Sequence, residues 1–66
     1  MFNNLKAEIT RRGLNKTKFA ALINMDSRLL SLKISGKSDF KYSEMQKIKE
    51  ALGDETLTLE YLFEFK

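Results

Sequence analysis

The sequence predicts an all-α protein, a compact bundle of five short helices with a central helix-turn-helix. Apolar residues recur at the spacing of an amphipathic helix in successive stretches, and no proline interrupts them. Glycines at positions 13, 36 and 53 each follow such a stretch, where a helix commonly ends. The 66 residues, 42% of them hydrophobic, suffice for one core. We therefore expect a single domain over residues 1–66.

The first helix is expected from Asn4 to Arg12. Phe2, Leu5 and Ile9 would face inward, because positions i, i+3 and i+7 share one side of a helix. Gly13 would end this helix in the left-handed conformation that is common just after a helix C-terminus.

A corner at residues 24–26 separates two further helical periods in the middle of the chain. In the first period, Phe19, Ala20 and Ile23 share one face. Asn15 precedes this period as a plausible N-cap, because its side chain can accept a backbone amide. Two helices joined by a turn are therefore expected here.

The second helix of this pair is expected to bury one face in the core and to expose the other to solvent. Asp26 is suited to cap it, and a rotation of about 100° per residue places Ile34 beside Leu30 on the inner side. The outer side carries Arg28, Ser31, Leu32 and Ser35. A helix held to a core by its inner face, with a basic and hydrogen-bonding outer face, fits the major groove of DNA.

A loop over residues 36–41 follows, in which Phe40 is expected to fold back into the core. The fourth helix would run from Tyr42 to Leu52 and stop at Gly53. Its inward residues would be Met45, Ile48 and Leu52.

The last ten residues fit two structures. Apolar residues alternate with mostly polar ones, which is typical of a half-buried strand. The alternating residues are Leu57, Leu59, Tyr61, Phe63 and Phe65. Thr58 could instead cap a helical turn with Leu59, Leu62 and Phe63 on one side.

In order and spacing these features resemble the lambda-type helix-turn-helix domains of phage Cro and repressor proteins and related bacterial regulators. The resemblance covers nearly the whole chain. Ala20 stands at the small residue that lets the two helices approach, Asn24 stands where the family usually has glycine, and Leu30 matches the buried residue of the second helix. Further matches are residues 34–37, Phe40, Glu44, Ile48 and Leu52-Gly53. Residues 58–63 resemble a short terminal helix, so the resemblance favours helix over strand there.

The resemblance implies a sequence-specific transcription regulator that binds double-stranded DNA. Such a protein would act as a homodimer on a two-fold operator, with its recognition helix in the major groove. Asp26 departs from the family's usual Ser or Thr, and a carboxylate at the edge of the groove would repel phosphate. Direct backbone contact at that position is therefore in doubt.

The distribution of charge agrees with a polyanionic partner. Residues 1–41 hold nine basic and three acidic side chains, whereas residues 42–66 hold three basic and six acidic ones. A basic half that contains the helix-turn-helix would orient the protein on DNA. Helices of soluble proteins also carry charges that are simply solvated, and that remains the alternative for any single lysine.

Composition also argues against several other classes of protein. The chain has no Cys and no His, so disulfides, thiolate–metal sites and the commonest general base are absent. We expect no cofactor, no metal, no small-molecule ligand and no enzymatic activity, because little volume remains for a pocket beside the core. No apolar run approaches the length that spans a bilayer and no signal peptide is evident, so a cytoplasmic location is expected.

Four residues are candidates for contact with base edges, namely Ser27, Arg28, Ser31 and Leu32. Arg28 has a planar fork that can donate two hydrogen bonds to guanine. Ser27 and Ser31 could hydrogen-bond to bases or could simply be solvated. Leu32 could touch a thymine methyl group or pack on Phe40 across the loop.

Seven residues are candidates for contact with phosphate. Lys16 lies in the first turn of a helix, where free backbone amides also attract an anion. Lys37, Ser38 and Lys41 lie in the loop after the recognition helix and resemble the family's second backbone clamp. The others are Lys18, Lys33 and Ser35.

The C-terminal segment is expected to form the homodimer, because it holds more apolar surface than one small domain needs. The interface residues would be Leu59, Tyr61, Leu62, Phe63 and Phe65. Two alternatives remain open. Leu59 and Leu62 could simply cover the monomer core. Alternatively, the chain could be a protein-interaction module with a helix-turn-helix fold, and this segment could bind a different protein.

Overall fold

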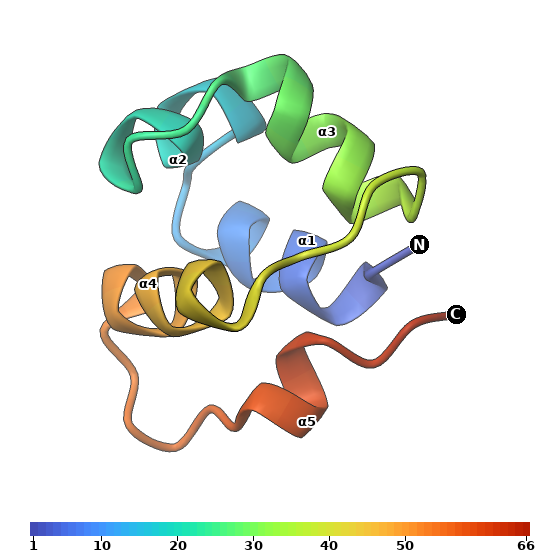
Figure 1. Ribbon diagram of the computed structural model, residues 1–66. Helices are drawn as coiled ribbons and strands as arrows, with labels where there is room; N and C mark the ends of the chain where they lie inside the picture. Colours follow the sequence, from blue (N-terminus) through green and yellow to red (C-terminus); the bar gives the residue numbers. More distant parts are fainter.

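Five helices and no strands make up the fold in a computed structural model, which describes residues 1–66. The helices are α1 (Asn3–Arg11), α2 (Lys16–Leu22), α3 (Ser27–Ser35), α4 (Tyr42–Leu52) and α5 (Leu59–Leu62). Figure 1 shows α2 and α3 at one end of the molecule and α5 at the other, with α1 and α4 between them. The predicted all-α architecture is confirmed. No helix combines the length and the apolar character that crossing a membrane requires.

Side-chain caps begin three of the helices, as the sequence predicts. Asn15, Asp26 and Thr58 accept backbone amides in the first turns of α2, α3 and α5, with N···O distances of 2.8, 2.8 and 3.1 Å. Because Thr58 caps a helical turn, the strand alternative for the last ten residues is wrong.

The turn between α2 and α3 depends on a left-handed residue. Asn24 has φ of +55°, and the amide of Met25 donates to the carbonyl of Ala20 at 2.9 Å, which closes the end of α2. Gly36 ends α3 in the same way, with φ of +89° and the amide of Lys37 donating to Leu32 O at 2.9 Å. Both positions are ones where the sequence predicts a turn.

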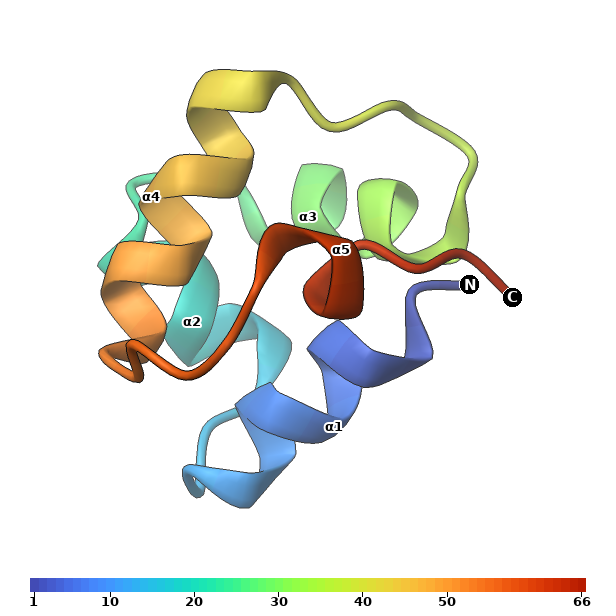
Figure 2. The same ribbon diagram turned by 90° about the horizontal axis from the view of Figure 1, so that it is seen from below.

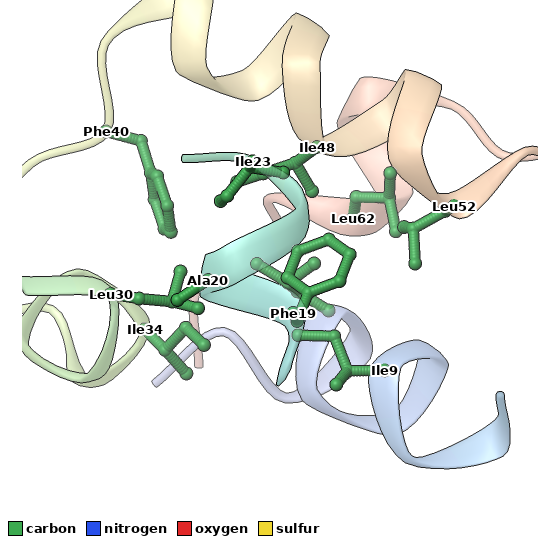
Figure 3. Packing of buried hydrophobic residues seen from close by; sticks show 11 residues of the cluster. Ile9, Phe19, Ala20, Ile23, Leu30, Ile34, Phe40, Ile48, Leu52 and Leu62 are labelled. Carbon is green, nitrogen blue, oxygen red and sulfur yellow. The ribbon is translucent and has the colours of Figure 1, made fainter. Parts of the chain in front are cut away.

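One cluster of buried apolar side chains draws on every helix. Figure 3 shows Phe19 of α2 near its centre, with Ile9 of α1 on one side and Leu52 and Leu62 on the other. The buried members are Leu5, Ile9, Phe19, Ala20, Ile23, Leu30, Ile34, Phe40, Ile48, Leu52 and Leu62. Leu30 and Ile34 belong to the inner face of α3, so the core fixes this helix and leaves its opposite side to solvent.

The two ends of the chain pair with each other beside the C-terminal end of α3. The amide of Lys66 donates to Met1 O at 3.0 Å, and the amino group of Met1 hydrogen-bonds to Lys66 O. The amide of Phe2 donates to Ile34 O at 2.8 Å, which ties this pair to α3. Figures 1 and 2 both place the N- and C-termini side by side.

Four rings reinforce the contact between the chain ends, and we refer to Phe2, Phe40, Phe63 and Phe65 as the aromatic cluster. Phe2 meets the other three edge-on, with centroid separations of 5.1 to 5.9 Å. Phe40 and Phe63 are 5.1 Å apart in the same geometry. Phe40 therefore folds into the core as predicted, and the C-terminal tail packs within its own monomer.

A buried carboxylate joins α1 to α5. Glu8 is 2% exposed, and it accepts hydrogen bonds from Arg12 at 2.8 Å and from the hydroxyl of Tyr61 at 2.9 Å. The hydrogen bond from Arg12 is the main reason that the pKa of Glu8 is lowered, and with the bond from Tyr61 it outweighs the effect of burial. Glu8 is therefore held as an anion inside the fold.

Candidate nucleic-acid interface

The outer face of α3 is exposed or half-buried along its length. Arg28 is exposed, Leu32 is 44% exposed, and Ser27 and Ser31 are half-buried. In Figure 1 this helix lies on the outside of the bundle, at the end opposite to α5. All four predicted base-contact residues therefore lie on a surface that another molecule can reach.

The guanidinium of Arg28 has no partner within the protein. It makes neither an ion pair nor a hydrogen bond. Asp26, the nearest acidic residue in the sequence, instead accepts the backbone amides of Arg28 and Leu29 at 2.8 and 3.3 Å. The fork of donors on Arg28 thus remains available for an external acceptor.

Lys16 and Ser31 form a pair that bridges α2 and α3. The Nζ of Lys16 donates to Ser31 Oγ over 3.3 Å, and both side chains are half-buried. The sequence assigns Lys16 to phosphate and Ser31 to bases, without linking them. The structure brings them together, so that the ammonium group lies against the outer face of α3.

Leu32 stays at the surface, and the ring of Phe40 is packed edge-on against Phe2 and Phe63. Leu29, which the sequence does not single out, is also 38% exposed. It lies about 100° around the helix from Arg28, on the flank of the outer face. Together these two leucines give the face its apolar component.

Four of the predicted phosphate contacts lie beside α3, with Lys18 on α2 and Lys37, Ser38 and Lys41 in the segment that follows α3. Lys18, Lys37 and Lys41 are exposed and take part in no ion pair. Ser38 is half-buried. These residues remain candidates for contact with a polyanion.

The prediction that Lys33 contacts phosphate is wrong. Its side chain is 5% exposed, and its Nζ lies 2.5 Å from Glu44 Oε1 of α4 and 6.0 Å from the ring centroid of Phe40. Burial alone would raise the pKa of Glu44, but the hydrogen bonds from Lys33 and from the amide of Lys41 lower it overall. Lys33 therefore fastens α3 to α4 and does not reach solvent.

Ser35 also differs from its predicted role. Its hydroxyl donates to Leu32 O at 2.9 Å, one turn back in α3. A phosphate accepts hydrogen bonds and offers none, so a hydroxyl whose proton is already engaged cannot donate to it. In this conformation Ser35 belongs to the helix end and not to a phosphate site.

Ion pairing divides the basic residues of the N-terminal half into two groups. Arg11 and Arg12 pair with Glu8 at 3.2 and 2.8 Å, and Lys33 pairs with Glu44. The remaining six make no ion pair, namely Lys6, Lys16, Lys18, Arg28, Lys37 and Lys41. Five of these six are predicted contact residues, so the uncompensated charge concentrates on and around the α2–α3 motif.

The predicted dimer residues divide by burial. Leu62 is fully buried in the monomer core, so its assignment to an interface is wrong and the alternative, that it covers the core, is confirmed. Phe63 is half-buried in the aromatic cluster. Phe65 is 57% exposed, Tyr61 is 37% exposed with its hydroxyl on Glu8, and Leu59 is half-buried. Leu62 leaves no surface for a partner, whereas the other four are at least partly exposed, and Phe65 is the most exposed of them.

Comparisons with protein-family models, with curated proteins and with solved structures found nothing that matches this chain. The functional argument therefore depends on its own residues.

Proposed function

We propose that this protein is a sequence-specific double-stranded-DNA-binding transcription regulator that inserts α3 into the major groove. The observation that carries the proposal is the division of α3 into two faces. Leu30 and Ile34 bury the inner face, while Arg28 extends from the outer face with every side-chain donor unused. A rigid helix with free donors on one side is suited to reading base edges.

The free cations supply the electrostatic part of the proposed binding. Lys18 lies on α2, while Lys37 and Lys41 flank the loop after α3. Lysines on both sides of a recognition helix would contact phosphates on the two walls of the groove and fix its register. Binding of this kind weakens as salt increases, because each neutralised phosphate releases counterions.

The proposal includes a homodimer on a two-fold operator. The nine residues of α3 extend about 13 Å, which covers only a few base pairs. Two copies with recognition helices about 34 Å apart would read enough sequence to be selective. The exposed parts of Phe65, Tyr61 and Leu59 are the surface that we assign to this contact. Regulation would follow from occupancy of a promoter in the cytoplasm, with no chemical reaction.

The alternative of a protein-interaction module has less support. It depends on the C-terminal segment as a free apolar surface, whereas Leu62 is in the core and Phe63 packs on Phe2 and Phe40. The outer face of α3 also presents the unused donors of Arg28, which suit a polar partner such as a base edge.

Selection of bound duplexes from a random pool tests the proposal. We expect enrichment of one palindromic site, bound with an affinity that decreases steeply as salt is raised. The variant Lys49→Met serves as a control, because Lys49 lies on α4 in the acidic half and should leave the selected site unchanged. Recovery of unenriched sequences, all bound equally, would refute sequence-specific recognition.

A further inference from the structure

We propose that the long side chains of the recognition face, together with Ser31, read only hydrogen-bond acceptors and methyl groups, and that each half-site therefore presents two guanines and a thymine to α3. One guanine would pair with Arg28, the other would pair with the Lys16–Ser31 pair, and Leu32 would contact the thymine methyl group. This inference rests on the proposed function and specifies the bases that the same surface recognises.

The composition of α3 sets the first limit. Residues 27–35 contain no Asn, Gln, Asp or Glu. Paired contact with adenine uses an amide, which both donates and accepts, and contact with the amino group of cytosine needs an acceptor. Arg and Lys side chains only donate. The long side chains on this face can therefore satisfy the acceptors of guanine but not the amino group of adenine or of cytosine.

The Lys16–Ser31 pair favours the serine as a donor toward DNA. An ammonium group has no lone pair, so Ser31 Oγ is the acceptor in the 3.3 Å contact. Its own proton has no acceptor within the protein, in contrast to Ser35, which donates to Leu32 O. Accepting from a cation polarises the O–H bond and strengthens it as a donor. Lys16 and Ser31 therefore present two donors at one place.

The spacing of the groups along α3 agrees with neighbouring base pairs. Ser31 follows Arg28 by three residues, which is about 4.5 Å along the helix axis. Base pairs stack about 3.4 Å apart, so these donors reach bases one or two steps apart. Leu32 lies about 40° around the helix from Arg28, on the same outer face, and can meet a methyl group beside them.

The carboxylate at the start of α3 accepts hydrogen bonds from the helix itself. Asp26 caps α3, and its Oδ1 accepts two backbone amides at 2.8 and 3.3 Å. It lies before the first turn of the helix, so it is not placed among the outward side chains of Arg28, Ser31 and Leu32.

Base analogues in the selected duplex test the inference. Replacing a contacted guanine with 7-deazaguanine removes the N7 acceptor, and we expect the affinity of the wild-type protein to fall about tenfold. Replacing the contacted thymine with deoxyuridine removes one methyl group and should weaken binding about fourfold. Replacing any adenine with purine, which lacks the amino group, should leave affinity unchanged.

Protein variants assign each guanine to its partner. In Ser31→Ala and Lys16→Met, the 7-deazaguanine effect should disappear at the guanine that we assign to the Lys16–Ser31 pair and persist at the other. In Arg28→Ala it should disappear at the guanine that we assign to Arg28 and persist at the first. Ser43→Ala and Lys49→Met on α4 are the matched controls and should behave as the wild type. Circular dichroism on every variant verifies that the fold is retained.

The outcomes separate the two levels of the argument. If no duplex is enriched, the proposed function fails. If a site is enriched but its affinity depends on the amino group of adenine or is insensitive to 7-deazaguanine, DNA recognition stands and the acceptor-only inference is overturned. If Lys16→Met weakens all duplexes equally, Lys16 is a phosphate contact and the paired reading of guanine is wrong.

Discussion

Replacing Lys33 with Met should separate the structural lysine from those that we propose contact DNA. Lys33 is a basic residue of α3, yet its side chain is 5% exposed and its Nζ is 2.5 Å from Glu44 Oε1. Met has nearly the same length and no charge, so Lys33→Met removes the ion pair without leaving a large cavity.

The size of the effect follows from what Glu44 retains. Its side chain is 20% exposed, and it still accepts the amide of Lys41 at 2.8 Å, so it is left without its cation but not without a partner. We therefore expect a loss of about 2 kcal/mol, below the range for a fully buried pair. For a domain of this size, such a loss corresponds to a decrease in Tm of about 8 to 16 °C.

Thermal unfolding and DNA binding at several salt concentrations are the two assays. For Lys33→Met we expect the lower Tm and an unchanged slope of log affinity against log salt. Adding Glu44→Gln should recover much of the Tm, because Gln removes the unpaired charge and keeps an oxygen for the amide of Lys41. Lys37→Met is the matched control, with unchanged Tm and a slope reduced by about 0.9. An unchanged Tm and a reduced slope for Lys33→Met would refute the buried ion pair.

Three further predictions concern the carboxylate network, the end of α3 and the tail. The pKa of Glu8 is lowered from its ordinary value of 4.5, so its stabilising effect is present above that pH and is lost as pH falls through the folded-state pKa. Tm should therefore decrease below about pH 4.5, and Glu8→Gln should flatten that decrease. An unchanged pH dependence in Glu8→Gln would show that the acid sensitivity arises elsewhere. Gly36→Ala should lower the free energy of unfolding by at least about 1 kcal/mol, because φ is +89° and the added Cβ would lie 2.6 Å from Phe65 Cζ. The control Gly13→Ala, with φ of +71° and open space around it, should lower it by less. Equal losses in the two variants would argue against the Phe65 contact. Sedimentation should show a wild-type dimer and a folded Phe65→Ser monomer, whereas a monomeric wild type at high micromolar concentration would exclude a preformed C-terminal dimer.

Local features of the fold could be predicted because their signals lie within a few residues. Asn15 and Asp26 precede helical periods and have side chains that accept amides, and they cap α2 and α3 as expected. Asn24 tolerates a left-handed backbone and adopts one. The outward position of Arg28 follows from helical periodicity once Leu30 is taken as buried.

Features that depend on distant partners could not be predicted in the same way. Glu8 is buried because Arg12 and Tyr61 reach it, and Tyr61 is 53 residues away in the sequence. Lys33 lies about 60° around the helix from Leu30, which points inward, but lysine is seldom buried without a partner and Glu44 was not identifiable as that partner.

The C-terminal segment shows the limit of counting apolar residues. Its composition indicates a surface to be covered, but not whether a second copy or the same chain covers it. Leu62 enters the core, and Phe63 joins Phe2 and Phe40, because the two chain ends meet beside α3. That meeting joins residues 65 positions apart, and no local pattern encodes it.

The most direct test of the central claim compares Arg28→Ala with the wild type on the selected operator and on a scrambled duplex of the same composition. The outer face of α3 reads bases if the variant loses about 1 to 3 kcal/mol of binding free energy on the operator and almost none on the scrambled duplex. Equal losses on both duplexes would make Arg28 a phosphate contact. No loss on either would contradict the proposal that α3 enters the major groove.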